Sequence, residues 1–211
     1  MTRRCRGSRY WTFPGYWQAR GAHKIWRISA PRSQRSNTRS GATIRVAGPP
    51  YLEAPGTAER MSAYFICCNR GKRSVAVDYS TPEGAATIRS LALEADVLVE
   101  NYKVGTLKRY GLDYHSLKAL NSRLIYVSIT GFGQDGPMAD KPGYDYVFQG
   151  MGGLMSYTGL PDGQAGAGPL RTGVAVVDLT TGMYATSAVW RPCSSALPAA
   201  WEHTWTLPCL M

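Results

Sequence analysis

An alternation of strand-like and helix-like segments limits the possible folds of this chain more than any other feature. Three short segments have the character of strands. RSVAVDY (73–79) alternates apolar and polar residues, DVLVEN (96–101) is mostly apolar like a buried parallel strand, and LIYVSITG (124–131) is rich in β-branched residues. Two segments between them have the character of helices: TPEGAATIRSLALEA (81–95) and YHSLKALN (114–121). This order predicts an α/β fold with a Rossmann-like parallel sheet and flanking helices, in which ligands lie beyond the carboxyl ends of the strands.

The sequence also predicts where helices begin. Ser80 or Thr81 is expected to cap the first helix, because a Pro-Glu pair that suits a first helical turn follows them. Asp113 is a suitable N-cap for the second helix. Before it, a turn at 103–105 leads into a short helical piece, TLKRYG (106–111).

After the third strand the chain becomes rich in glycine. GQDGPMADKPG (133–143) has the composition of a loop. YDYVFQGMGGLMSY (144–157) is compatible with a helix that three glycines interrupt, at about 1 kcal/mol each relative to alanine. These glycines serve either close helix packing or close approach of the backbone to a ligand. The GMGG string lacks the spacing and the preceding strand of a dinucleotide-binding fingerprint. Residues 174–189 are predicted to form another helix.

Asp178, near the start of that helix, is the strongest candidate for a functional side chain. Its neighbours are small, apolar or hydroxylated, and no basic residue is closer in sequence than Arg171. An ionised carboxylate in apolar surroundings is costly unless something stabilises or uses it. The N–H groups and dipole of a helix start favour the anion. The residues alone leave two interpretations, a helix-capping aspartate or a reactive carboxylate.

The formal net charge of +10 belongs to one end of the chain. Residues 1–47 contain 11 Lys/Arg and no acidic residue, and residues 190–211 contain one residue of each sign. That leaves 12 basic and 13 acidic residues in 48–189, which also contains none of the six tryptophans. Composition therefore divides the chain into three parts. The acid-free start is typical either of a tail that binds nucleic acid non-specifically or of a mitochondrial transit peptide.

Other compositional signals are weak. Five cysteines include no CxxC pair, so we expect no disulfide framework and take a cytoplasmic location as the default. Three scattered histidines have no metal-ligand spacing, so no metal site is predicted. No apolar run approaches the roughly 18 residues of a membrane span, so no membrane association is expected.

Five strings within residues 48–189 resemble the class III CoA-transferases, the group of formyl-CoA transferase, carnitine CoA-transferase and succinyl-CoA:dicarboxylate CoA-transferase. They are NRGKRSVAVDYSTPEG, ADVLVENYKVGTLKRYGLDY, SITGFGQDGP, GYDYVFQGMGGLMSYTG and GVAVVDLTTGMYA. The resemblance implies transfer of CoA from an acyl-CoA to a carboxylic acid, with coenzyme A as substrate and no permanently bound cofactor. It implies that Asp178 is the nucleophile, through aspartyl-anhydride and aspartyl-CoA intermediates. The acids stay open, and the dicarboxylate-handling members are the most similar.

The resemblance also implies which residues contact the substrates. They are Val77 and Asp78 after the first strand, Asn101 and Tyr102 at the end of the second, Arg109 near the phosphates, and Tyr144 and Asp145 at the acyl site. A guanidinium suits charge-assisted bonds to phosphate. The residues alone leave an alternative for two of them: a solvated helix charge for Arg109 and ordinary core packing for Tyr144.

The family normally opens with a strand, an LAGPxC loop and an LADLGAEVIKVE helix, and none of these is visible in residues 1–47. If the codons of residues 10–44 are read in a shifted phase, they can encode LDLSRVLAGPWCAQNLADLGAEV and KVEHPERGDDT. The codons of residues 201–209, shifted in the same way, can encode GxHVDVALL. We hypothesise that residues 1–47 and about 190–211 are frame-shifted, non-native and disordered ends around an α/β CoA-transferase segment, 48–189. An uninterrupted reading frame on resequencing the gene would refute this hypothesis.

Frame-shifted ends have consequences for function. We expect the 211-residue chain to show little activity and not to form the interlocked homodimer of intact family members. One competing hypothesis is an inactive fragment whose basic tail binds nucleic acid non-specifically, tested by salt-sensitive DNA binding that is lost when residues 1–47 are deleted. Another is a nicotinamide-linked enzyme, which the missing glycine fingerprint disfavours.

Overall fold

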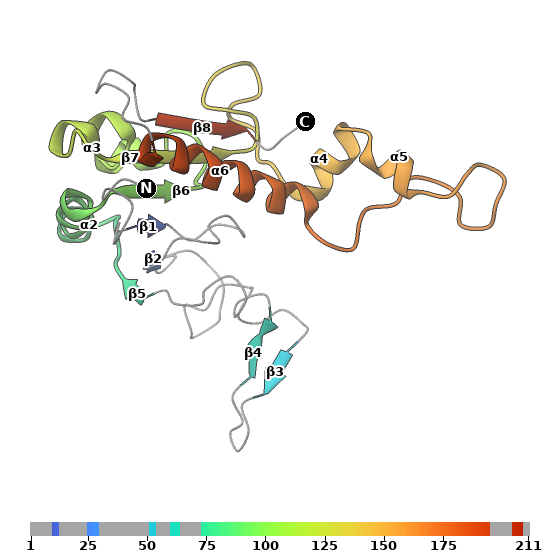
Figure 1. The fold of residues 1–211 in the computed structure, drawn as a ribbon, viewed down its shortest axis with the longest axis horizontal. Helices are drawn as coiled ribbons and strands as arrows, with labels where there is room; N and C mark the ends of the chain where they lie inside the picture. Colours follow the sequence, from blue (N-terminus) through green and yellow to red (C-terminus); the bar gives the residue numbers. More distant parts are fainter. Residues whose placement is uncertain are drawn as a thin grey trace.

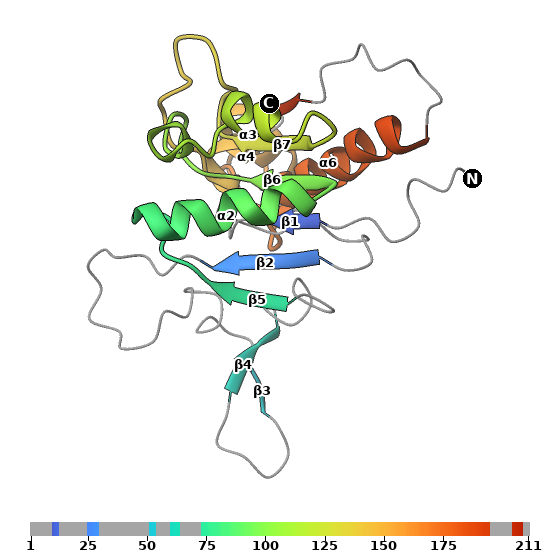
Figure 2. The ribbon, with the colours of Figure 1, turned by 90° about the vertical axis from the view of Figure 1, so that its left-hand side faces the viewer.

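The computed structural model describes residues 10–12, 25–29, 51–53, 60–63, 73–194 and 204–208. At its centre lies a six-stranded sheet in the order β5-β2-β1-β6-β7-β8, in which every neighbouring pair is parallel. Its strands are β1 (Tyr10–Thr12), β2 (Ile25–Ser29), β5 (Arg73–Ala76), β6 (Val97–Glu100), β7 (Ile125–Thr130) and β8 (Thr204–Pro208). A separate antiparallel pair, β3 (Tyr51–Glu53) and β4 (Arg60–Ser62), lies next to β5 in Figure 2.

Helices cover both faces of the sheet. α2 and α3 pack on one face and α6 on the other. The helical elements are α2 (Pro82–Glu94), the 3₁₀ helix η2 (Leu107–Tyr110), α3 (Tyr114–Leu120), α4 (Asp145–Met151), α5 (Leu154–Thr158) and α6 (Val176–Ser194). Figure 2 shows α2 in front of the sheet, and Figure 1 shows α6 running across it. The α/β fold with a parallel sheet and flanking helices that the sequence predicts is confirmed.

Side-chain alternation along the strands explains this layering. Leu98 of β6 and Tyr126 of β7 point to one face, where they join a buried cluster with residues of α2 and α3. Their neighbours point to the opposite face and form a second buried cluster that includes Ala185 of α6: Val97, Val99, Ile125, Val127 and Ile129. Because successive strand residues point to opposite faces, strands buried on both sides are mostly apolar, as the sequences of these runs indicate.

The helix starts agree with the sequence signals. Thr81 rather than Ser80 caps α2, because its Oγ1 accepts the N–H of Gly84 at 3.1 Å. Asp113 occupies the N-cap position of α3, where its Oδ1 accepts the hydroxyl of Ser116 at 2.5 Å. The predicted helical piece at 106–111 forms η2.

The glycine-rich segment forms two short helices that extend away from the sheet (Figure 1). α4 ends at Met151 and α5 begins after Gly153, whose φ of +77° is strained for any residue with a side chain. Gly153 therefore has a reason other than close helix packing or ligand approach. Its positive φ allows the turn that separates α4 from α5. Gly150 lies inside α4 with ordinary space around it.

The two ends that the sequence analysis set apart contribute strands to the sheet. β1 and β2 lie within residues 1–47, and β8 lies within residues 190–211. β1 pairs with β6, and β8 pairs with β7. The expectation of non-native, disordered ends stays a prediction. The division of the chain at residues 47 and 190 stays a prediction.

Candidate active site

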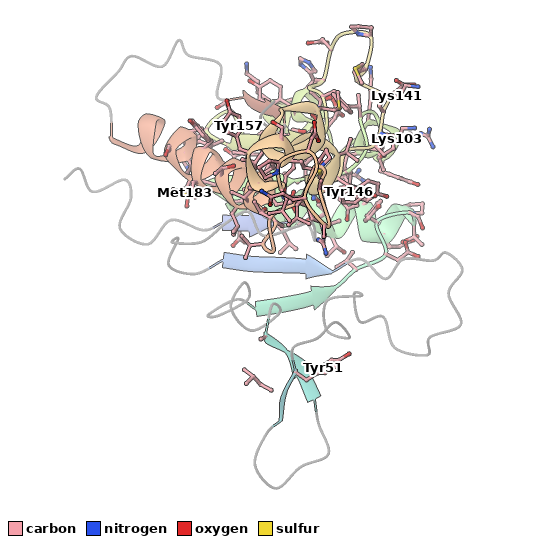
Figure 3. The ribbon with its side chains drawn as sticks, turned by 90° about the vertical axis from the view of Figure 1, so that its right-hand side faces the viewer. Tyr51, Lys103, Lys141, Tyr146, Tyr157 and Met183 are labelled. Carbon is pink, nitrogen blue, oxygen red and sulfur yellow. The ribbon has the colours of Figure 1, made fainter. Side chains whose placement is uncertain are left out.

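Asp178 lies in the first turn of α6, and its side chain is only 6% exposed. Val177 beside it is buried and packs against Phe148 of α4. Met183, further along α6, is 68% exposed and lies at the surface in Figure 3, so it does not shield this carboxyl. A buried carboxyl at a helix N-terminus combines exclusion of water with a local field that favours the anion.

The side chain of Asp145, at the start of α4, reaches the N-terminus of α6. Its Oδ1 accepts the backbone N–H of Val177 at 2.8 Å and that of Asp178 at 3.3 Å. Asp145 is therefore the capping carboxylate of α6, since helix N-termini leave such N–H groups without intrahelical partners. The structure thus brings together two of the site residues predicted from the sequence.

Tyr144 precedes Asp145 and is 52% exposed, so it is not a core residue. Its ring stacks on that of Tyr146, with 6.0 Å between centroids and 12° between planes. The core-packing interpretation of Tyr144 is therefore wrong, and its ring is accessible beside the start of α4.

Gln149 is a site residue that the sequence analysis missed. It is 1% exposed, and its Nε2 donates to Oδ2 of Asp145 at 2.6 Å. Its Oε1 accepts the backbone N–H of Thr172 at 2.9 Å. Only the spacing of four residues between Asp145 and Gln149 on one helix could have indicated this pair.

The loop after β7 holds α4 in this position. The backbones of Gly131 and Gly143 approach so closely that a Cβ on Gly143 would lie 2.7 Å from Cα of Gly131 and 2.3 Å from Cζ of Phe148. Phe148 packs edge-on against Phe132, with 5.2 Å between ring centroids, and also against Val177. The loop is therefore closed at its base, and Phe148 links it to α6.

A second group of predicted residues gathers around Tyr79. The Tyr79 ring lies 5.6 Å from that of Tyr102 and 5.2 Å from that of Tyr110, measured between centroids. Asp78 and Arg109 are sequence neighbours of these tyrosines. The contacts therefore bring the segment after β5, the segment after β6 and the end of η2 into one place.

Individual members of this group differ in accessibility. Val77 belongs to the buried core, Asn101 is half-buried and Arg109 is exposed. Oδ1 of Asp78 accepts the hydroxyl and the N–H of Ser80 at 2.6 and 3.0 Å, and these bonds hold the pKa of Asp78 below its usual range.

Two further cations lie at the carboxyl-terminal edge of the sheet. Figure 3 shows Lys103 and Lys141 on the side toward which the strand arrows point. Both are exposed, and they follow β6 and β7 respectively. Neither lysine is among the site residues predicted from the sequence. With Arg109 they offer positive charge to an anionic ligand at the edge where α/β folds bind ligands.

Glu100, the last residue of β6, is a buried carboxyl at the same edge. It is 5% exposed, and its Oε2 accepts the N–H of Tyr102 at 2.8 Å. Ser128 of β7 also hydrogen bonds to it, and the Ser128 hydroxyl in turn accepts from Nε2 of Gln134 at 2.7 Å. Burial raises the pKa of Glu100 to about 7, although the bonds from Ser128 and Tyr102 offset part of this effect.

The raised pKa of Glu100 predicts that the stability of the folded protein depends on pH. The folded-state pKa of about 7 exceeds the usual 4.5, so the folded protein binds a proton that the unfolded chain has released between these values. The free energy of unfolding should therefore fall as pH rises from 4.5 to 7, by about 3 kcal/mol in total, and level off above 7. Urea unfolding of Glu100→Gln across this range should lack that fall. A Glu83→Gln variant, altered at an exposed carboxyl, should keep it; equal profiles for both variants would contradict the assignment.

Within the described residues, no group of three or more His, Cys, Asp or Glu side chains could hold a metal ion. Among the helices of the same part of the chain, none is both long and apolar enough to cross a membrane.

Comparison with known proteins places this arrangement in a family. A sequence model of the family described as CoA-transferase family III matches residues 37–194. The succinate–glutarate CoA-transferase of Agrobacterium fabrum is 52% identical over 153 residues, which are 72% of this chain and 37% of that protein. The human succinyl-CoA:glutarate CoA-transferase is 42% identical over 150 residues, 71% of this chain and 32% of that protein.

Solved structures agree. A CAIB/BAIF family protein from Brucella suis superimposes with a TM-score of 0.78 at 38% identity, covering 96% of this chain and 52% of that chain. A Mycobacterium tuberculosis protein gives a TM-score of 0.69 at 28% identity, covering 88% and 49%. The chain thus spans about a third of the length of these curated relatives and about half of these solved chains. The resemblance indicated by the five sequence strings is confirmed, and the chain belongs to CoA-transferase family III.

Proposed function

We propose that this protein takes part in the transfer of CoA from an acyl-CoA to a carboxylic acid, with Asp178 as the nucleophile. The observation that carries the proposal is a buried carboxyl in the first turn of α6, in a chain of CoA-transferase family III. A carboxylate is a weak nucleophile, so it must be held against the thioester, and water must be kept from the anhydrides that form. The burial of Asp178 meets the second requirement.

The proposed reaction has four steps. An oxygen of Asp178 attacks the thioester carbonyl; the C–S bond breaks, and CoA leaves as its thiolate, which gives an aspartyl-acyl anhydride. The thiolate attacks the aspartyl carbonyl and expels the donor acid as a carboxylate, which leaves an aspartyl-CoA thioester. The acceptor carboxylate then attacks this thioester and releases the thiolate. Finally the thiolate attacks the acceptor's acyl carbonyl and regenerates Asp178 as a carboxylate.

We propose that the carboxyl-terminal edge of the sheet binds the CoA moiety. Asp78, Asn101 and Tyr102 are candidates for contacts to the nucleotide part, and Val77 supports the segment after β5 from the core. The exposed cations of this edge, Lys103, Arg109 and Lys141, are suited to the phosphates, because charge-assisted bonds to phosphate are strong. Tyr144 is accessible beside α4 and is a candidate for lining the acyl site.

The proposed acids are dicarboxylates. Two relatives are named as transferring CoA between succinate and glutarate. The test is a transfer assay with succinyl-CoA and isotope-labelled glutarate, run on the 211-residue chain and on a version with both ends in the corrected frame. Labelled glutaryl-CoA is the expected product of the corrected version, with much less from the 211-residue chain. Hydrolysis to free CoA with no labelled thioester would contradict the proposed transfer.

A further inference from the structure

The buried amide of Gln149 holds two parts of the chain that lie far apart in sequence. Its donor end bonds to Oδ2 of Asp145 at 2.6 Å, and its acceptor end bonds to the N–H of Thr172 at 2.9 Å. A polar side chain that is 1% exposed costs stability unless its hydrogen-bonding groups have partners. An apolar residue of the same size could fill this space but could make neither bond.

The bond to Asp145 leads directly to the nucleophile. With one carboxylate oxygen held by Gln149, the other accepts the N–H of Val177 at 2.8 Å and of Asp178 at 3.3 Å. The Gln149 donor thereby fixes the orientation of the carboxylate that caps α6. Rotation of Asp145 would release both N–H groups of the turn that carries the Asp178 side chain.

The bond to Thr172 fixes the other end of the same segment. Residues 159–171 form an exposed loop beyond α5, and Thr172 is where the chain returns toward α6. The Thr172 hydroxyl also donates to the carbonyl of Val174 at 2.8 Å. Gln149 thus holds residues 172–178 at both ends, once directly and once through Asp145.

We propose that Gln149 is a positioning residue for Asp178, acting through Asp145 and Thr172 to set the first turn of α6. This inference rests on the proposed role of Asp178 as nucleophile. Attack by a carboxylate depends on its distance and angle to the thioester carbonyl, and a displacement of about 1 Å costs on the order of 10²-fold in rate.

The test uses Gln149→Met, which keeps the volume but removes both hydrogen bonds, and Gln149→Glu. Gln164→Met, altered on the exposed loop, is the matched control. Two readouts are measured: the single-turnover rate at which an acyl-CoA modifies Asp178, and amide hydrogen exchange of Thr172, Val177 and Asp178. Gln149→Met should slow modification about 10- to 100-fold and speed exchange at these amides at least about tenfold, with less than about a twofold change in the Kd for CoA.

Gln149→Glu adds a second measurement, the pH dependence of the modification rate, which would not change if Gln149 had a merely structural role. The ionised Glu accepts from Thr172 but cannot donate to Asp145, whereas the protonated form can. Its modification rate relative to the wild type should therefore recover as the pH falls. Wild-type rates in Gln149→Met, or no recovery in Gln149→Glu, would overturn the inference. If neither the 211-residue chain nor the version with both ends in the corrected frame forms an adduct, the proposed function fails instead. Hydrogen exchange in the 211-residue chain then decides on positioning, with unchanged exchange in Gln149→Met overturning it.

Discussion

Replacing Asp178 by asparagine, in the version whose two ends are read in the shifted frame, is expected to reduce CoA transfer by at least about 10³-fold. The substitution keeps the shape of a side chain that is almost fully buried. However, a neutral amide oxygen is a much poorer nucleophile than a carboxylate oxygen, and it cannot form the proposed aspartyl anhydride. Initial rates of thioester transfer measure the effect. Because water can convert the new asparagine back to aspartate, the mass of the variant must be checked before the assay.

Asp162→Asn is the matched control for this prediction. Asp162 is exposed on the loop beyond α5, so its replacement should leave the rate within about twofold of the wild type. If Asp178→Asn keeps more than about a tenth of the wild-type rate, covalent catalysis by Asp178 is wrong. CoA binding should persist in the variant, because the proposed CoA contacts lie in other segments.

Replacing Gly143 by alanine is expected to lower the free energy of unfolding by about 1–3 kcal/mol. The added methyl would lie 2.3 Å from Cζ of Phe148 and 2.7 Å from Cα of Gly131. Neither neighbour can yield easily, because Phe148 is buried between Phe132 and Val177 and the other contact is backbone. Urea unfolding monitored by circular dichroism gives the measurement.

Gly150→Ala, in the same region, is expected to have the opposite effect on the free energy of unfolding. Gly150 lies inside α4, where the nearest atom to an added methyl is Sδ of Met155 at 3.8 Å. Alanine is the better helix former by about 1 kcal/mol, so this variant should be stabilised by up to that amount. Equal effects of the two substitutions would show that the contact between the loop and Phe148 is not what restricts residue 143.

The parts of the fold that the sequence predicts are those determined by local pattern. β6 and β7 are mostly apolar because both of their faces are buried, and this is visible as runs rich in β-branched residues. The start of α2 follows from Thr81 and the proline after it, and the start of α3 from Asp113. In each case the determining residues lie within a few positions of the element.

The parts that the sequence does not predict depend on contacts between distant residues. Asp145 caps a helix that begins more than 30 residues later, and Gln149 bonds to a backbone group 23 residues away. Neither contact produces a periodic pattern of residues in the sequence. The environment of buried Glu100 likewise includes a residue of another strand, since Ser128 of β7 hydrogen bonds to it, and the sequence around Glu100 does not specify that contact.

The strands at the two ends of the chain are likewise not predicted by local sequence pattern. β1, β2 and β8 are placed in the sheet by pairing with neighbouring strands, although the composition of residues 1–47 and 190–211 gives no strand pattern. The family match begins at residue 37, ten residues before the boundary drawn from composition. Composition therefore separates the ends from the middle without marking where each structural element begins.

The most direct test of the central claim is mass spectrometry of the peptide that contains Asp178. The protein is incubated with an acyl-CoA, quenched with hydroxylamine and digested, so that an aspartyl-CoA thioester is trapped as a hydroxamate. The account predicts a hydroxamate on Asp178 that depends on acyl-CoA and is absent from Asp178→Asn. Transfer of CoA to an acceptor acid with Asp178 unmodified, or with the hydroxamate on a different carboxyl, would contradict it.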